Sequence, residues 1–300
     1  MSIILYLFYA ILTIACVRQF LRLLLSLSYN FKRKHNQPVV YPKISIIVPA
    51  YNEEKTIEKV VTFLLSSSLV DEIICINDGS KDSTEEILKQ FGNKIIFINL
   101  KQNKGKGNAL AQGIKIAKGD IVIFLDADLV TLSDEHIHLL LEPLRKKTHR
   151  AVIGYLIGKI GFNIFSEISG QRAYYKADLM PHTEEMIDTR FGIEMFLNGL
   201  FSEKETKKIP LPKLRGLFKY EKQDGETAIK EYIQEGIEIA KVIANKEILP
   251  KGDSILLKEI SAITDMKGLK ESIAKIKNKR IKNILEKYIL KYLLLSEKQK

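Results

Sequence analysis

The sequence predicts an α/β protein with a mostly parallel β-sheet flanked by helices. Short apolar runs that suit buried strands alternate with longer stretches in which apolar residues recur at helical spacing. A polar cluster follows each of the first four apolar runs. The 300 residues are 46% hydrophobic and 28% charged, which is typical of a folded globular chain and excludes a disordered one.

Five apolar runs are expected to form strands, and helical stretches separate them. The strands are Ile44–Val48, Ile73–Ile76, Ile95–Ile98, Ile121–Leu125 and Ala151–Gly154. The helices are Glu54–Leu65, Ser83–Phe91, Gly107–Lys118 and a stretch from about Asp134 to Lys146. Strands that alternate with helices indicate βαβ units with right-handed crossovers, and therefore parallel strands.

The polar clusters are expected to converge on one cleft, because ligands of open α/β sheets bind outside the carboxyl ends of the strands. Each cluster alone is also typical of an ordinary turn. Their order along the chain favours a functional site. The clusters are Pro49-Ala50-Tyr51-Asn52-Glu53-Glu54, Asn77-Asp78-Gly79-Ser80, Asn103-Lys104-Gly105-Lys106-Gly107 and Asp126-Ala127-Asp128.

Each cluster has a chemistry that suits a nucleotide. Asp126 and Asp128 offer the oxygen ligands that a divalent cation prefers, and such a cation can neutralise a diphosphate leaving group. Asp78 can accept a hydrogen bond from a base or a ribose hydroxyl. Gly105 lets the backbone approach a ligand closely, and Lys106 can meet phosphate charge.

The net charge of +11 is concentrated at the two ends of the chain. Residues 1–43 hold six Lys or Arg and no acid, and residues 251–300 hold thirteen basic and six acidic residues. A nucleic-acid binder more often carries its charge on the folded domain, so basic ends favour an anionic membrane surface. Lysine-rich helix faces that are simply solvated remain the alternative.

The N-terminal segment predicts a membrane anchor. Ile3–Leu27 is apolar apart from Arg18, Gln19 and Arg22, and it is long enough to span a bilayer. Lys32-Arg33-Lys34 follows, which places that side in the cytoplasm. We expect an uncleaved single-pass anchor in the cell membrane with a cytoplasmic catalytic domain. An in-plane interfacial helix is the alternative. Cys16 and Cys75 offer no disulfide framework or CxxC metal site.

These clusters resemble those of the family 2 glycosyltransferases, which have the GT-A fold. The resemblance covers about residues 44–200 and rests on the four clusters together with Asn108-Ala109, Gly119-Asp120 and Leu129. It implies a nucleotide-diphosphate sugar donor, linked to UDP or GDP, and a DxD motif that binds Mg²⁺ or Mn²⁺. Asn77 departs from the family, which usually has Asp there.

The resemblance assigns roles to individual residues. It implies that Asp128 binds the metal that bridges the diphosphate and that Asp126 faces the ribose or the metal. Glu194, in Gly192-Ile193-Glu194, is the candidate general base or a sugar-hydroxyl contact, with a solvated helical Glu as the alternative. The residues expected around the donor are Pro49, Ala50, Tyr51, Glu53, Asp78, Lys106, Asp126 and Arg172. Arg172 is either a phosphate partner or part of a structural ion pair.

Histidine contributes little to the expected site. Some relatives carry a metal-binding His after a Gly-Leu pair, but here Gly216-Leu217 leads to Phe218, Lys219 and Tyr220. His136 and His138 are expected on a helix surface.

The expected acceptor is membrane-associated, such as a polyprenyl phosphate, since an anchor raises the effective concentration of a membrane acceptor. Dolichyl-phosphate glucosyltransferases resemble this layout. The alternatives are transfer to a small hydroxy acid such as phosphoglycerate, a non-catalytic nucleotide-sugar binder, a nucleotidyltransferase and a receiver domain.

The last segment, with apolar residues from Ile281 to Leu295 at helical spacing, faces either a membrane or the catalytic domain. The expected organisation is an anchor (1–31), a basic linker (32–43), a GT-A domain (44–224) and a helical extension (225–300).

Overall fold

The computed structural model describes residues 13, 16–24, 42–156, 166–217, 219–222, 224–244, 251–260, 263 and 266–286. The chain divides into two compact units, Met1–Tyr41 and Pro42–Lys300. In the first unit, residues 16–24 are helical and exposed. No helix among the described residues has the length and apolar character needed to span a bilayer. Most of the predicted anchor, 1–31, and of the linker, 32–43, lies outside the described residues.

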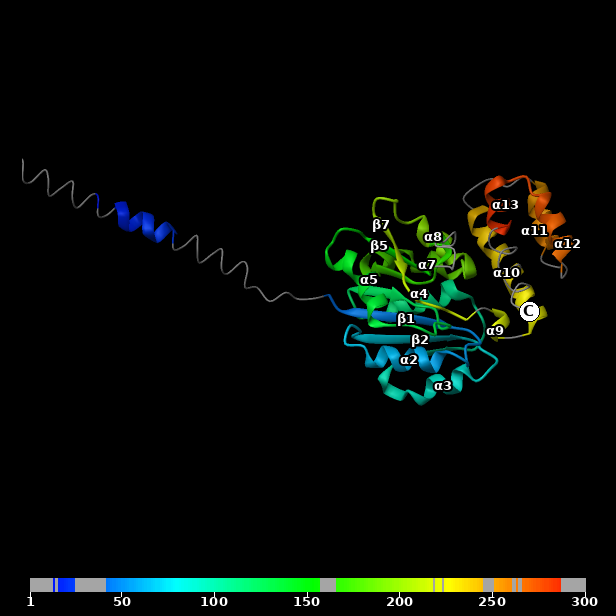
Figure 1. The fold of residues 1–300 in the computed structure, drawn as a ribbon, viewed down its shortest axis with the longest axis horizontal. Helices are drawn as coiled ribbons and strands as arrows, with labels where there is room; N and C mark the ends of the chain where they lie inside the picture. The colour runs from blue at the N-terminus through cyan, green and yellow to red at the C-terminus, as the bar shows by residue number, and fades with distance from the viewer. Residues whose placement is uncertain are drawn as a thin grey trace, which may run out of the picture. The chain divides into compact units, whose positions relative to one another are not determined.

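One sheet of seven strands organises the described part of the second unit, in the order β3-β2-β1-β4-β6-β5-β7 (Figure 1). Strands β1 to β4 are parallel, with Ile46 beside Ile73 on one side and Ile123 on the other. Strand β6 runs antiparallel between β4 and β5, and β7 pairs parallel with β5. The bounds are β1 Ile44–Ala50, β2 Glu72–Asp78, β3 Ile96–Leu100, β4 Ile121–Phe124, β5 Ala151–Leu156, β6 Arg172–Tyr175 and β7 Thr206–Leu211.

Helices cover both faces of this sheet because the central strands are apolar on both sides. In β1, Ile46 and Val48 pack into a cluster with α2 (Ile57–Ser66), α3 (Thr84–Gln90) and α5 (Asp134–Arg145). Ile47, whose side chain points the other way, packs into a second cluster with α4 (Lys106–Ile116), α7 (Thr183–Ile187) and α8 (Ile193–Asn198). Near-continuous burial of this kind is what a parallel sheet with two covered faces requires.

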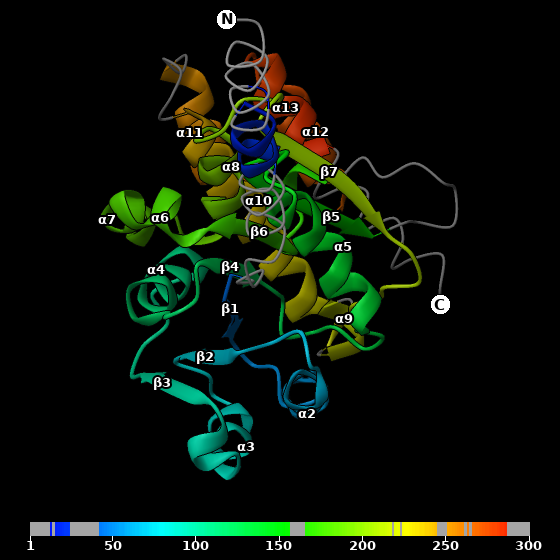
Figure 2. The same ribbon diagram turned by 90° about the vertical axis from the view of Figure 1, so that its left-hand side faces the viewer.

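The C-terminal helices form a third apolar cluster that joins the same compact unit. They are α10 (Gly225–Ala244), α11 (Lys251–Ile260), α12 (Met266–Ala274) and α13 (Lys279–Leu285), and the short helix α9 (Lys219–Lys222) precedes them. Helix α10 packs against α8 and the 3₁₀ turn η4 (Arg190–Gly192), and Figure 2 shows α10 to α13 gathered beside α8, away from β3. The remaining short elements are η1 (Gly92–Lys94), η2 (Ser166–Ile168), α6 (Lys176–Leu179) and η3 (Met180–His182).

The structure confirms the α/β prediction, adds two strands to it, decides between the two alternatives for the last segment and corrects the position of one histidine. The sequence pattern did not predict β6, a four-residue strand, or β7, which carries two exposed lysines and an exposed proline. Ile281 and Leu285 are fully buried in the third cluster, so this part of the last segment packs on the protein and does not face a membrane. His136 is also buried, with Nε2 bound to the carbonyl of Pro212, although a surface position was expected.

Candidate active site

The loop after β2 is fixed by Asp78, whose two carboxylate oxygens bind backbone. The N–H groups of Lys104 and Gly105 donate to Oδ1 and Oδ2 at 2.8 and 2.7 Å. Burial raises the pKa of Asp78, and these two N–H groups oppose the rise. Gly105 has a φ of +93°, which favours glycine, and a Cβ there would lie 2.8 Å from the Cα of Arg190. Asp78 therefore holds together two of the predicted polar clusters.

The loop after β1 is tied to the same region by short polar side chains. Asn52 has a φ of 57°; its N–H donates to Ser80 Oγ at 2.9 Å, and its Oδ1 accepts from the N–H of Lys81 at 2.8 Å. Asn77 is buried and its Oδ1 accepts from the N–H of Ser80 at 3.2 Å. The residue that departs from the family pattern therefore supports a turn. Pro49 and Ala50 end β1, and half-buried Tyr51 follows them.

Lys106 lies between two carboxylates that are far apart in sequence. Its Nζ is 2.6 Å from Asp126 Oδ1 and 2.8 Å from Glu194 Oε1. Burial alone would lower the pKa of Lys106, but the two carboxylates outweigh it and raise the pKa above its ordinary value. Burial would likewise raise the pKa of Asp126, but Lys106 outweighs it and lowers that pKa. The three predicted residues thus form one buried charge cluster.

Asp126 is also held by the turn that precedes β6. Gln171 donates from Nε2 to Asp126 Oδ2 at 2.8 Å. Gly170 lies so close that a Cβ there would be 2.2 Å from Asp126 Oδ1. The turn can approach the carboxylate because position 170 has no side chain.

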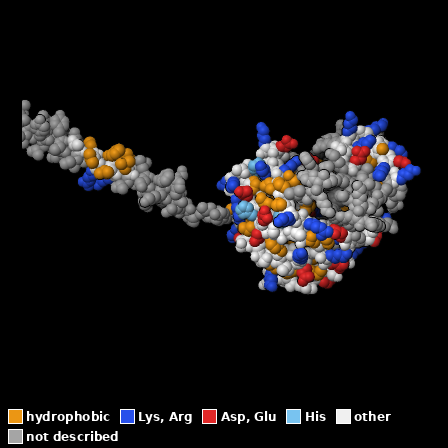
Figure 3. Space-filling model, in the orientation of Figure 1, with side chains coloured by type: hydrophobic (Ala, Val, Ile, Leu, Met, Phe, Trp, Pro, Cys, Tyr) orange, Lys and Arg blue, Asp and Glu red, His pale blue; other side chains and the backbone are white. Residues whose placement is uncertain are grey.

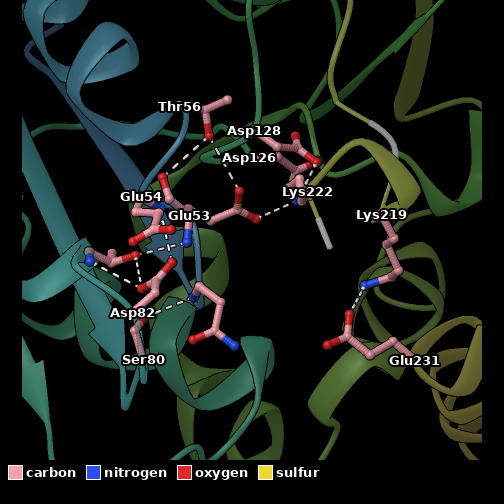
Figure 4. A network of polar contacts seen from close by, with 12 residues as sticks. Glu53, Glu54, Thr56, Ser80, Asp82, Asp126, Asp128, Lys219, Lys222 and Glu231 are labelled. Atoms are coloured by element: carbon pink, nitrogen blue, oxygen red, sulfur yellow. Dashed lines mark hydrogen bonds and ion pairs between the residues drawn. The ribbon is translucent and has the colours of Figure 1, made fainter. Parts of the chain in front are cut away.

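Asp128 and Glu53 share a second lysine. The Lys222 Nζ, from α9, lies 2.7 Å from Glu53 Oε1 and 3.2 Å from Asp128 Oδ2, as Figure 4 shows. Burial raises the pKa of Glu53 to about 7, with Lys222 opposing the rise and Asp128 adding to it. Burial also raises the pKa of Asp128, again against Lys222. Lys222 was not among the predicted site residues.

The segment before α9 runs alongside the DxD motif. Leu129 forms an antiparallel bridge with Gly216, and the N–H of Leu217 donates to the carbonyl of Asp128 at 2.9 Å. A Cβ on Gly216 would lie 3.1 Å from Asp128 Oδ1. Some relatives have a metal-binding histidine in this stretch, and this chain has none at that point. The side chain that contacts Asp128 here is Lys222 of α9.

Arg172 binds protein groups through each nitrogen of its guanidinium. Nε donates to the carbonyl of Ser169 at 2.6 Å, Nη2 to that of Glu167 at 2.7 Å, and Nη1 to Asn198 Oδ1 at 2.7 Å and to the Tyr174 hydroxyl at 3.1 Å. The side chain is 1% exposed. These contacts fix the turn that carries Gly170 and Gln171. Contact between Arg172 and the donor stays a prediction, and the phosphate-partner alternative gains no support from this geometry.

The comparison with protein families shows the family of this chain. The family described as Glycosyl transferase family 2 matches residues 45–197, which is just over half of the chain. The chain belongs to this family. The matched range holds every predicted site residue, and Lys222 lies outside it.

Two curated relatives and one solved structure indicate the breadth of this glycosyltransferase family. Poly-beta-1,6-N-acetyl-D-glucosamine synthase of Staphylococcus aureus (strain COL) is 44% identical over 94 residues, which are 30% of this chain and 23% of that protein. Dolichyl-phosphate beta-glucosyltransferase of Dictyostelium discoideum is 31% identical over 161 residues, 49% of each chain. The chain therefore spans at most about half the length of these relatives.

The fold is similar to that of glucosyl-3-phosphoglycerate synthase from Mycobacterium tuberculosis, in a complex with Mn²⁺, UDP-glucose and phosphoglyceric acid. The TM-score is 0.53 at 22% identity, and the match covers 70% of this chain and 82% of that one. This likeness shows that the glycosyltransferase shares its fold with a known GT-A enzyme.

The carboxylates of this glycosyltransferase suit a divalent cation in their chemistry. Among residues 42–156 and the other described segments, no group of three His, Cys, Asp or Glu side chains is arranged to hold a metal. Mg²⁺ commonly takes only one or two carboxylates, together with phosphate oxygens and water. Asp128, with Oδ1 beside Gly216, fits that role better than Asp126, whose two oxygens already bind Lys106 and Gln171.

Proposed function

We propose that the protein transfers a sugar from a nucleoside-diphosphate sugar, with a divalent cation, to a polyprenyl phosphate at a membrane surface. The observation that carries the donor side is the meeting of the Asp78 loop with Asp126 and Asp128, at the carboxyl ends of the neighbouring strands β2, β1 and β4. In open α/β sheets this edge is where ligands bind.

The donor half of the site has a group for each part of a sugar nucleotide. Asp78 uses one lone pair of each oxygen on the backbone, so further lone pairs can accept from a base or a ribose. Tyr51 and Pro49 stand at the end of β1 beside that position. A cation held by Asp128, when bound, neutralises the charge that develops on the diphosphate leaving group.

The acceptor side supports a nucleophile that is already anionic. Glu194 is paired with Lys106 at 2.8 Å, and Lys106 also holds Asp126. A carboxylate tied into such a buried cluster is poorly placed to take a proton from a sugar or glycerate hydroxyl, because doing so would break the ion pair. A phosphate oxygen needs no general base. The dolichyl-phosphate glucosyltransferase relative adds weight to this acceptor class.

The N-terminal segment supplies the proposed link to the membrane. Ile3–Leu27 is predominantly apolar and Lys32-Arg33-Lys34 follows it, as in a single-pass anchor with a cytoplasmic enzyme domain. Removal of residues 1–31 is expected to release the protein from membranes into the supernatant after centrifugation. Continued sedimentation would contradict this segment as the only anchor.

An acceptor panel tests the proposal directly. The full-length protein is incubated with UDP- or GDP-linked glucose and N-acetylglucosamine, with and without Mn²⁺, and with polyprenyl phosphate in detergent, 3-phosphoglycerate or no acceptor. We expect Mn²⁺-dependent transfer to polyprenyl phosphate, and none with Asp128→Ala. Transfer to phosphoglycerate alone would favour the hydroxy-acid reading. Nucleotide binding without turnover would favour a non-catalytic binder.

Glu194→Gln separates the two acceptor chemistries. Transfer to a phosphate is expected to fall less than about tenfold, whereas loss of a general base costs about 100-fold or more. Glu184→Gln, which removes a carboxylate from a surface ion pair with Lys115, is the matched control.

A further inference from the structure

Lys222 forms an ion pair with the carboxylate of Asp128, the predicted metal ligand. Its ammonium bridges Asp128 Oδ2 and Glu53 Oε1, and the three side chains are largely buried, with exposed fractions of 15%, 27% and 13%. Burial would lower the pKa of Lys222, but Asp128 and Glu53 outweigh it and raise that pKa. The lysine is therefore a charged partner of both acids.

The contact is specific to the last residue of α9. Two other side chains of this short helix are bound elsewhere: Lys219 Nζ lies 3.0 Å from Glu231 and 2.8 Å from Glu235 of α10, and Glu221 pairs with Arg215. Figure 4 shows Lys219 and Lys222 pointing to different carboxylates. The Lys222 side chain can thus leave Asp128 by rotating its own methylene chain, without α9 losing its other contacts.

A divalent cation and the Lys222 ammonium need the same charge on Asp128. A divalent cation on either oxygen of Asp128 would lie a few ångströms from the ammonium on Oδ2, and at low exposure such like charges repel more strongly than in water. Asp126 is a weaker ligand than Asp128, since Lys106 already neutralises its charge and Gln171 binds its other oxygen. Binding of a metal at this position therefore has to move Lys222.

We propose that Lys222 is a built-in counter-ion of the donor site, which holds Asp128 and Glu53 until a divalent cation displaces it. This inference rests on the proposed metal-dependent donor binding. Lys222 keeps two buried carboxylates neutralised before the donor arrives, and it lowers the affinity of the site for metal alone. It is a positioning residue that the family motifs do not include, since it lies beyond residue 197.

Binding of Mn²⁺ to the full-length protein tests the inference without any turnover. Free Mn²⁺ is measured by electron paramagnetic resonance, with and without UDP. Lys222→Met is expected to bind Mn²⁺ about tenfold more tightly than the wild type, because the competing charge is gone. Lys222→Arg, which keeps the charge, is expected to stay near the wild type, and Lys115→Met controls for loss of a surface lysine.

The outcomes separate the inference from the proposed function. Equal or weaker Mn²⁺ binding by Lys222→Met would overturn the counter-ion role, while Mn²⁺-dependent transfer by the wild type would leave the proposed function standing. Tighter Mn²⁺ binding by Lys222→Met, without any sugar transfer by the wild type, would support the counter-ion role and contradict the proposed function. Absence of Mn²⁺ binding in all variants would overturn both. Lys222→Gln repeats the test with a polar side chain, and thermal unfolding verifies that each variant is folded.

Discussion

The two halves of the site are held in different ways. On the donor side, short polar side chains bind backbone groups of neighbouring loops, as Asp78 binds the N–H groups of Lys104 and Gly105. On the C-terminal side, long side chains from α9 and η4 make ion pairs, as Lys222 does with Asp128 and Arg190 does with Glu238 at 3.1 Å. The first half is fixed by the backbone, and the second depends on side chains with many rotamers.

This difference matters for the chemistry of transfer. Loops fixed by backbone contacts need little reorganisation to bind a ligand, so less of the binding free energy is spent on ordering them. Ion pairs between long side chains can exchange one charged partner for another at modest cost. On the face that Figure 3 shows, Lys and Arg side chains are interspersed with Asp and Glu side chains.

The largest effect is expected when the backbone-fixed half is broken at Asp78. Asp78→Ala leaves the N–H groups of Lys104 and Gly105 without their acceptor, the second of them buried, and each charge-assisted hydrogen bond of this kind is worth roughly 1.5–3 kcal/mol. UDP affinity, measured by calorimetry with Mn²⁺, is expected to fall about 100-fold or more. Asp120→Ala removes a carboxylate that accepts from the N–H of Lys43, before the other end of β4, and should leave UDP affinity unchanged.

A smaller effect is expected from strain in the same half. Gly105→Ala forces a side chain into a backbone conformation with φ of +93° and against Arg190, so the free energy of unfolding should fall by about 2–4 kcal/mol. Gly92→Ala, at φ of +55° with open space around it, isolates the conformational cost of about 1 kcal/mol. Equal losses in urea unfolding would show that the contact with Arg190 contributes nothing.

The smallest effect is expected on the pH dependence of stability, through the titration of Glu53 in the ion-paired half. Glu53 has a pKa raised from 4.5 to about 7 by burial, so between these values the folded protein holds more protons than the unfolded chain. Its contribution to stability is therefore full below pH 4.5 and is lost as the pH rises through 7. The stability of the wild type relative to Glu53→Gln is expected to fall by roughly 1–3 kcal/mol from pH 5 to 7.5.

Glu205→Gln is the control for that titration. The N–H and hydroxyl of Ser202 and the guanidinium of Arg150 lower the pKa of Glu205 to about 2, so its contribution changes only at more acid pH. Urea unfolding of both variants across the range gives the comparison. A flat difference for Glu53→Gln would contradict the burial argument.

Most of the fold and site prediction rested on local sequence patterns. Each of the four polar clusters is a short continuous stretch of sequence after an apolar run. The α/β topology alone therefore predicts that the clusters converge. Asn77 shows the limit of this reasoning, because an amide that orders a turn cannot be told from a ligand contact without seeing its partners. Arg172 is similar: it was expected around the donor, but its buried contacts are with Ser169, Glu167, Asn198 and Tyr174.

Long-range pairings escaped prediction. Lys222 is 94 residues from Asp128 and 169 from Glu53, and Gln171 is 45 residues from Asp126. No periodicity or motif spacing links such positions, since they depend on how α9 and the turn before β6 return to the sheet. The one available signal was the missing histidine after Gly216-Leu217, which pointed to that segment as a neighbour of the metal site without naming a lysine.

The antiparallel insertion of β6 connects the turn before it to the DxD motif. Strand β6 is hydrogen-bonded along β4, and the turn that begins it, with Gly170 and Gln171, rests on Asp126. A shift of that turn would therefore reach the carboxylate that pairs with Lys106. Under the proposed function, an acceptor that contacts the turn would be positioned relative to the sugar donor through a single ladder of the sheet.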